Sequence, residues 1–339
     1  MNITLLKQTL ILPILFAIAG CQESNPFSAE VADYQKRISN IIQVPYNEIS
    51  VQPSRFPQKR DLVIPLKPIS IDWQDFFSVN QCADLQQLIA HRNSQLGKNM
   101  EAATRLLYEK KLLLQLTSCI KKLNTASNKV KTALETKQQQ FKPTVWNNTW
   151  ASNYWQKILS NSMNHRAVDK QSINNLVTQV SQLRETLLKQ DVIEKQHWFA
   201  RFQTMENSVG VIGSIVFEME YHIKVIGETS LMLSKELNAI CPNNSKSKQF
   251  KYLNNVLNKF YLQSIQKRQV ELLEIYSSIE EEFSKWIQFF PNEQMQFKEW
   301  FAVSFKQDSN SNLNNRFRQS ILEHVQVWQS IRDNCGINQ

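Results

Sequence analysis

Apolar residues recur at intervals of three and four positions along most of the chain, which is the period of a helix that buries one face. The longest series covers residues 202–240, and shorter series cover residues 173–187, 272–290 and 317–331. Apolar stripes of this length can be buried only against other helices. The pattern therefore predicts a mainly α fold, an elongated multi-helix bundle over residues 76–336.

Three glycines, Gly210, Gly213 and Gly227, lie inside the longest series, which we expect to form one helix. Each glycine costs a helix about 1 kcal/mol relative to alanine. Close packing of a neighbouring helix or a kink would explain their presence. A hinge or a ligand contact is the alternative.

The pattern changes between residues 45 and 75, where a helix is forbidden by repeated prolines. These are Pro45, Pro53, Pro57, Pro65 and Pro68, with Leu62, Ile64, Leu66, Ile69 and Ile71 between or after them. The segment predicts an extended arm wrapped over the bundle, with a short strand as one option. A flexible stalk is the alternative, but this many exposed Ile and Leu residues would be unusual in a stalk. Residues 29–42, before the arm, predict a first helix.

Residues 1–20 have the parts of a secretory signal: Lys7, an apolar stretch from Leu10 to Ile18, and a small pair before Cys21. The stretch is too short to span a bilayer, which needs about 20 residues. Ile18–Cys21 resembles the bacterial lipobox, with Ile where Leu is usual. The resemblance implies a diacylglycerol on the Cys21 sulfur and an acyl group on its amine, and Gln22 implies transfer to the outer membrane. An ordinary signal cut that leaves a soluble periplasmic protein is the alternative.

The organisation predicted from these patterns is a signal peptide over 1–20, a lipidated tether and first short helix over 21–44, the arm over 45–75 and the bundle over 76–336. Six glycines and ten prolines in 339 residues are few, which favours long helices. The net charge is +9, and removal of Lys7 with the signal leaves +8. This charge favours anionic partners such as phospholipid headgroups. No basic motif with stacking aromatics indicates nucleic acid as a partner.

Four cysteines remain beside the one assigned to lipid: Cys82, Cys119, Cys241 and Cys335. An even count in an oxidising compartment indicates two disulfides, for which three pairings exist. If one helix ends near residue 98 and the next begins near 103, the first two cysteines each lie 16 residues from the turn, about 24 Å along antiparallel helices. This register favours Cys82 with Cys119 and Cys241 with Cys335. Four free thiols or zinc ligation are the alternatives, although none of these cysteines has CxxC spacing.

The segment His91–Lys98 (HRNSQLGK), followed by Arg105–Glu109, resembles a family of proteobacterial lipoproteins known as domain of unknown function 3080. Asn255–Tyr261 and the Cys335-Gly336 pair fit the same family. The resemblance spans nearly the whole chain. It implies a lipid-anchored envelope protein with paired cysteines, and it implies no activity.

The same segment is the candidate binding site. As a helix end, it would place Gly97 in a left-handed cap and Arg92 and Lys98 near the negative end of the helix dipole. Arg92, Asn93 and Ser94 would then form a polar cluster that could bind an anionic group. The candidate binding residues are Arg92, Asn93, Ser94, Gly97 and Lys98.

No motif of catalysis, metal binding or phosphate binding stands out. The chain has no GxSxG elbow, no HExxH pair and no phosphate loop, so we expect no catalytic residue, metal or cofactor. His324 lies near the apolar stripe of the last helix and is predicted to be a hydrogen-bonded core histidine. The run Glu280–Glu282 is predicted to lie on a solvated helix face.

The function expected from these patterns is a non-enzymatic interaction or scaffold module, anchored by lipid and facing the periplasm from the outer membrane. Its partner would be another envelope protein or an anionic surface. A helical binding module for a lipid or another apolar small ligand is the alternative. A cell-wall enzyme ranks third and would need two carboxylates about 5 to 10 Å apart.

Overall fold

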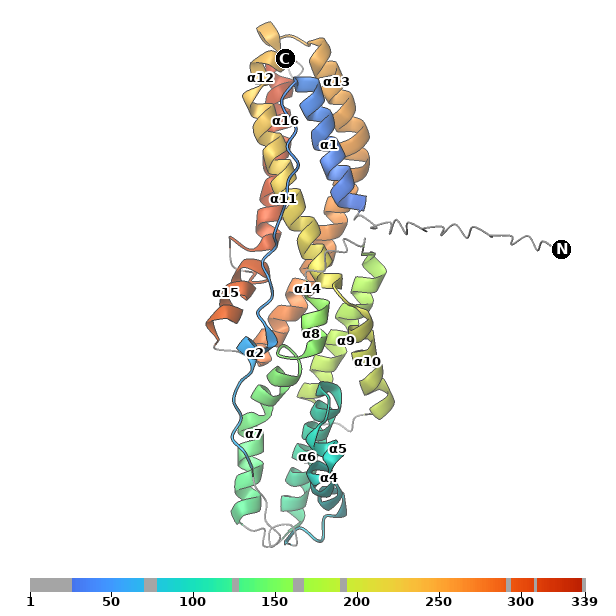
Figure 1. The fold of residues 1–339 in the computed structure, drawn as a ribbon, viewed down its shortest axis with the longest axis vertical. Helices are drawn as coiled ribbons and strands as arrows, with labels where there is room; N and C mark the ends of the chain where they lie inside the picture. The colour runs from blue at the N-terminus through green and yellow to red at the C-terminus, as the bar shows by residue number, and fades with distance from the viewer. Residues whose placement is uncertain are drawn as a thin grey trace, which may run out of the picture.

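The computed structural model describes residues 26–69, 78–123, 128–160, 168–189, 194–290, 294–307 and 310–336. Within these ranges all regular structure is helical and no strand occurs. The helices pack along one another into an elongated rod (Figure 1), which confirms the predicted fold class. The signal peptide, Cys21 and the end of the arm after residue 69 lie outside the described residues.

The upper part of the rod in Figure 1 combines the first helix with helices from the second half of the sequence. They are α1 (Pro26–Ile42), α11 (Val211–Lys235), α12 (Leu237–Ile240), the short η1 (Pro242–Asn244), α13 (Lys248–Val256) and α16 (Leu313–Asn334). Helix α13 continues through a π-helical segment, η2 (Leu257–Ile265), into α14 (Gln266–Phe289). The predicted first helix is confirmed, and it begins a few residues earlier than expected.

The middle and lower parts of the rod are built from shorter helices and hairpins (Figure 1). They are α2 (Lys59–Leu62), α4 (Ala83–Asn93), α5 (Gln95–Lys98), α6 (Ala102–Lys122), α7 (Asn128–Asn148), α8 (Asn153–Ile158), α9 (Lys170–Leu188), α10 (Lys195–Asn207) and α15 (Met295–Ser304). Helix α14 connects this part to the upper part, where it follows η2. The series predicted over 173–187, 272–290 and 317–331 correspond to α9, α14 and α16.

The prediction of one helix over residues 202–240 is wrong. The chain breaks after α10, and Gly210 takes a left-handed conformation (φ 67°) as the residue before α11. Its N–H donates to the carbonyl of Lys157 at 2.8 Å, so a contact with another helix fixes the turn. Val209, expected in the buried series, is 56% exposed at this break. At Gly210 the explanation that applies is the kink, because the helix is interrupted there.

The core has two parts. A large cluster runs through the upper and middle rod, and a smaller one lies in the hairpin end around Leu85, Leu112 and Leu116. The middle of the rod is filled by aromatic side chains in contact, such as Trp150 and Trp155, whose ring centroids are 4.4 Å apart. Large rings bury much apolar area each.

The arm is confirmed as an extended segment over residues 45–69, interrupted by the single turn of α2. Side chains of the bundle bind its backbone. Asn147 of α7 accepts from Ile64 N at 2.8 Å and donates to Ile64 O at 2.7 Å, while the Trp146 indole donates to Leu62 O at 2.8 Å. Gln156 donates to Pro57 O at 2.8 Å. These side-chain bonds satisfy backbone groups of the arm, as pairing with a neighbouring strand in a sheet would. The strand considered as one option does not occur in residues 45–69.

The rod has no candidate for a bilayer-crossing helix: within the described ranges, every helix is too short or too polar.

Candidate functional site

Two disulfides fix the ends of the rod. Cys82 precedes α4 and Cys119 lies in the last turn of α6, with 5.8 Å between their Cα atoms. Cys241 follows α12 and Cys335 follows α16, with 5.2 Å between their Cα atoms. These are the two pairs that the sequence favours.

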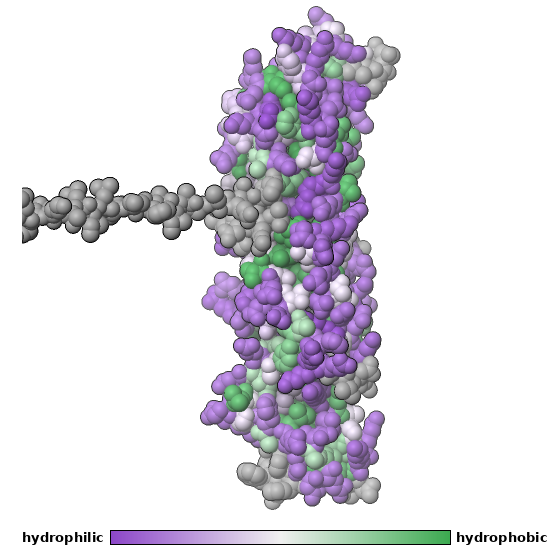
Figure 2. Space-filling model, turned by 90° about the vertical axis from the view of Figure 1, so that its right-hand side faces the viewer, coloured by the Kyte–Doolittle hydropathy of each residue, from purple (hydrophilic) through white to green (hydrophobic). Residues whose placement is uncertain are grey.

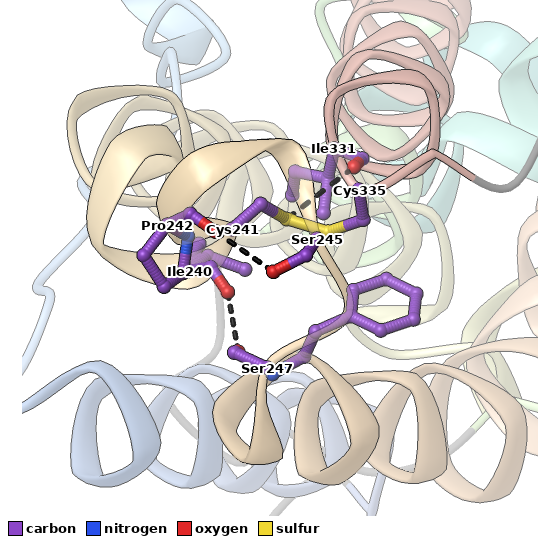
Figure 3. The surroundings of a disulfide bond; sticks show 8 residues. Ile240, Cys241, Pro242, Ser245, Ser247, Ile331 and Cys335 are labelled. Carbon is purple, nitrogen blue, oxygen red and sulfur yellow. Dashed lines mark hydrogen bonds between the residues drawn. A yellow bond between two sulfur atoms is a disulfide. The ribbon is translucent and has the colours of Figure 1, made fainter.

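Figure 3 shows how the second disulfide joins the end of α16 to the turn after α12. Ser245 Oγ donates to Pro242 O at 2.9 Å, and Ser247 Oγ donates to Ile240 O. Ser247 also accepts from Phe250 N at 2.9 Å and so caps α13. The turn is therefore held by hydrogen bonds as well as by sulfur.

The predicted binding segment is the tight turn between α4 and α6. Arg92 Nη1 donates to Gly97 O at 2.7 Å, and Ser94 Oγ accepts from Gly97 N at 3.1 Å. Ser94 Oγ also donates to His91 O at 2.7 Å. Much of the segment's polarity is therefore used to close the turn.

The left-handed cap predicted at Gly97 is wrong. Gly97 lies inside α5, and its φ is not among the positive values of the described glycines. A Cβ at this position would lie only 1.9 Å from the carbonyl oxygen of His91 and 2.8 Å from Arg92 Cα. Glycine is needed here because two backbone segments touch, not because of its own dihedral angles.

A cavity of about 340 Å³ lies beside this turn, between α4, α6, α7 and the arm. Arg92 and Asn93 of the candidate set line it, whereas Ser94, Gly97 and Lys98 do not. Its other polar lining includes Arg105, Glu109, Lys137 and Gln140. The remaining walls are mainly aliphatic side chains from α4, α6 and the arm.

The cavity carries an excess of positive charge. Glu109 is 3% exposed, and its carboxylate lies 2.5 Å from Arg105 Nη2 and 2.6 Å from Lys137 Nζ. With Arg92 and Lys67, four cationic residues line a space that contains one carboxylate. A buried carboxylate is tolerated only with such partners.

Tyr108 adds a neutral donor to this wall. Burial raises the pKa of its phenol to about 12, the nearby Glu109 carboxylate adds to the rise, and Arg105 and Arg92 oppose it. The Arg105 guanidinium lies 5.7 Å from the centroid of the Tyr108 ring. The site therefore presents donors and cations, a set suited to holding an anion.

Sequence reasoning missed most of this set. Arg105, Tyr108 and Glu109 belong to a segment noted for the family resemblance, but nothing in it indicated a site. Lys137 and Gln140 come from α7, far along the chain from Arg92. No spacing could have connected them, because only the packing of α7 on α6 brings them together.

A second group of polar side chains lies buried in the upper core. His324 is confirmed as a hydrogen-bonded core histidine: it contacts Tyr34 Oη at 2.9 Å, Ser230 Oγ at 2.8 Å and Trp328 Nε1 at 3.1 Å. Ser230 Oγ donates its proton to Ile226 O, so it accepts from Nδ1–H of the histidine, and the indole N–H donates to Nε2. The ring is thus a neutral, fixed tautomer.

His222 is a second fully buried histidine, which the sequence analysis did not single out. Its Nε2 lies 2.6 Å from Gln269 Nε2, and its ring packs 4.6 Å from that of Phe317. Burial lowers the pKa of both His222 and His324 to about 3. His222 falls three residues after Met219 on the apolar face of α11, a signal that could have placed it in the core.

The solvated face predicted for Glu280–Glu282 is correct only for Glu281. Glu280 accepts from Asn312 Nδ2 at 2.9 Å and Asn314 Nδ2 at 3.0 Å, and Glu282 accepts from Arg184 Nε at 2.7 Å. Both are buried because α16 and α9 pack along the two margins of α14's apolar stripe. Across the described part of the chain, no three His, Cys, Asp or Glu side chains are grouped to hold a metal ion.

Comparison with known proteins gives one result. A family model described as "Protein of unknown function (DUF3080)" matches residues 31–339. No curated protein and no solved structure shows a significant match. Because the matched segment runs from the second turn of α1 to the last residue, the chain belongs to the DUF3080 family of proteins of unknown function.

Proposed function

We propose that this chain is a lipid-anchored envelope protein that faces the periplasm from the outer membrane and acts without catalysis, as an interaction or scaffold module. The export pattern, the lipobox-like Ile18–Cys21 and Gln22 support the anchor and its destination. Two cysteine pairs at disulfide distance support an oxidising compartment.

The cavity beside Arg92 is the observation that carries the binding role. Four cationic residues and a single carboxylate line it, which favours an anionic group on the partner. A cell-wall hydrolase would need two carboxylates about 5 to 10 Å apart. Among the described residues that line the cavity, Glu109 is the only carboxylate, and two cations already hold it.

A second candidate function is the binding of a lipid or another apolar small ligand. It is favoured by the aliphatic side chains of Ile89, Leu112 and Leu116, which line the same cavity opposite the charged groups. Small-ligand sites usually combine apolar walls with a few positioned polar groups.

Cross-linking of intact cells tests the interaction role. Cells that produce the tagged full chain are cross-linked, and the recovered proteins are quantified. We expect a stoichiometric envelope partner with the wild type, loss of that partner with Arg92→Glu, and no loss with Lys131→Glu, an exposed position on α7. Consistent recovery of the wild-type chain alone would contradict the proposal.

The intact mass of the protein extracted from membranes tests the anchor. We expect the mass of the chain from Cys21 onward plus a diacylglycerol and one acyl group, and loss of membrane attachment in Cys21→Ala. An unprocessed chain with free thiols would contradict both the anchor and the compartment.

A further inference from the structure

We infer that the cavity between α4, α6, α7 and the arm binds an amphipathic anion: one phosphate or carboxylate head on a single alkyl chain. This inference deepens the second candidate function, the binding of a lipid or another apolar small ligand, and rests on it. The charged wall would hold the head, and the aliphatic wall would cover the chain.

The head site consists of three cations from three helices. Arg92 comes from α4, Arg105 from α6 and Lys137 from α7. Glu109 holds two of them, with Arg105 Nη2 at 2.5 Å and Lys137 Nζ at 2.6 Å from its oxygens. The carboxylate therefore orients these side chains, yet it balances only one positive charge.

Arg92 supplies the geometry for an oxyanion. Its Nη1 donates to Gly97 O at 2.7 Å, and this bond fixes the guanidinium at the cavity wall. A guanidinium presents a planar fork of several donors, which matches phosphate and carboxylate oxygens. The rest of the fork can therefore meet a ligand head without disturbing the turn.

The chain site is part of the smaller hydrophobic core. Ile89, Leu112 and Leu116 are 9%, 6% and 2% exposed and belong to the cluster at the hairpin end of the rod. Leu66 and Pro68 of the arm line the same space. A neutral polar ligand would set polar groups against this apolar wall, whereas an alkyl chain would match it.

The size of the cavity favours one chain over two. Its volume of about 340 Å³ is near the lower limit of small-ligand sites, which span roughly 300 to 1,000 Å³. Fatty acids and anionic lysophospholipids, such as lysophosphatidic acid, share the required chemistry, an anionic head and one chain. The two sources differ in the head, so the test includes both.

Calorimetric titration tests the ligand class. The full chain carrying Cys21→Ser, which bears no lipid of its own, is titrated with dodecyl phosphate, dodecanoate and lysophosphatidic acid. Inorganic phosphate provides the head without a chain, and dodecyl maltoside provides the chain without a charge. We expect the anionic amphiphiles to bind at least tenfold more tightly than either, and affinity to rise about fourfold per added methylene.

Variants test the location. Arg92→Gln and Lys137→Gln should each weaken binding of dodecyl phosphate about tenfold or more, while Lys131→Gln, exposed on the same helix as Lys137, should leave it unchanged. Thermal unfolding of each variant checks that the fold is kept. Stronger binding of dodecanoate than of the lysophospholipid would assign the fatty acid as the source.

Three outcomes would overturn the inference: no binding of any anionic amphiphile, equal binding of dodecyl maltoside, or binding unaffected by both Arg92→Gln and Lys137→Gln. None of these three outcomes would contradict the scaffold role, because an envelope partner recovered by cross-linking is an independent result. Conversely, binding of dodecyl phosphate without any recovered partner would retire the scaffold role and keep the ligand site.

Discussion

Gly97 and Gly227 are glycines with opposite surroundings, and they make a matched pair. A Cβ at Gly97 would meet backbone atoms of His91 and Arg92, whereas at Gly227, inside α11, nothing lies within 4 Å of it. Gly97→Ala must displace backbone and should lower the free energy of unfolding by about 1–3 kcal/mol. Gly227→Ala should raise it by about 1 kcal/mol, because alanine favours the helix. Denaturant unfolding measures both, and equal effects of the two substitutions would refute the close contact.

The two buried histidines predict how stability depends on pH. Burial lowers the folded-state pKa of His222 and His324 to about 3 from 6.5. The unfolded chain therefore binds protons below pH 6.5 that the folded chain refuses, so stability falls as the pH falls from about 6.5 towards 3. Between pH 7.5 and 5 the loss should be roughly 2 kcal/mol for each histidine. Burial raises the pKa of Glu280, which opposes part of this loss.

Urea unfolding at pH 7.5 and pH 5 measures this dependence. His324→Gln should reduce the loss by about half, although it also weakens the hydrogen bonds to Tyr34 and Trp328 at every pH. His197→Gln is the matched control, because that side chain is 70% exposed. Equal wild-type stability at the two pH values would contradict the prediction. It would mean that the folded protein accepts protons on these two rings.

At the scale of elements, the arm depends on side-chain amides of the bundle. The Asn147 amide accepts from Ile64 N and donates to Ile64 O, and a carboxylate, which only accepts, cannot make both bonds. Asn147→Asp keeps the shape but sets a carboxylate oxygen against the Ile64 carbonyl. Unfavourable contacts of this kind cost about 1–3 kcal/mol. We expect faster hydrogen exchange in residues 59–69.

The control for this prediction is Asn153→Asp. Asn153 Oδ1 accepts from the exposed Lys59 at 3.3 Å, and a carboxylate would keep that contact. Exchange in the arm should therefore stay at the wild-type rate. Equal rates in both variants and the wild type would show that the arm is held by its apolar side chains alone.

Helix periodicity predicted the elements well, and it failed where another helix decided the local structure. The series over 173–187 and 272–290 became α9 and α14, because their apolar stripes are continuous. The series over 202–240 did not reveal the break between α10 and α11. Val209 fits the helical period, while the turn at Gly210 depends on a hydrogen bond to the Lys157 carbonyl. A contact with a distant residue leaves no trace in the local pattern.

The candidate site shows the same limit. Arg92 and Asn93 were found because a polar run at a helix end stands out. Nothing in the local sequence distinguishes Arg105 and Lys137, since a cationic side chain on a helix usually lies in solvent. Only the buried Glu109, which α6 places between them, turns these two into part of one site.

At the scale of the whole molecule, the place where α1 begins limits how the rod can sit on a membrane. In Figure 1, α1 starts part-way along the rod and runs to the end where α16 finishes. Its 17 residues make it about 26 Å long. If Cys21 carries the anchor, the five residue steps to Pro26 reach at most about 18 Å.

The tether is thus too short for the rod to stand on that end, and the opposite end is farther still. We therefore expect the rod to lie with its long axis along the membrane. The face in Figure 2 is mostly hydrophilic with small separate apolar areas. A surface of this kind suits contact with headgroups rather than insertion. Polarised infrared spectra of the lipidated chain on supported bilayers should show helix axes in the membrane plane. A twenty-residue Gly/Ser insertion after Cys21 should weaken this order, and helices along the membrane normal in the wild type would contradict the geometry.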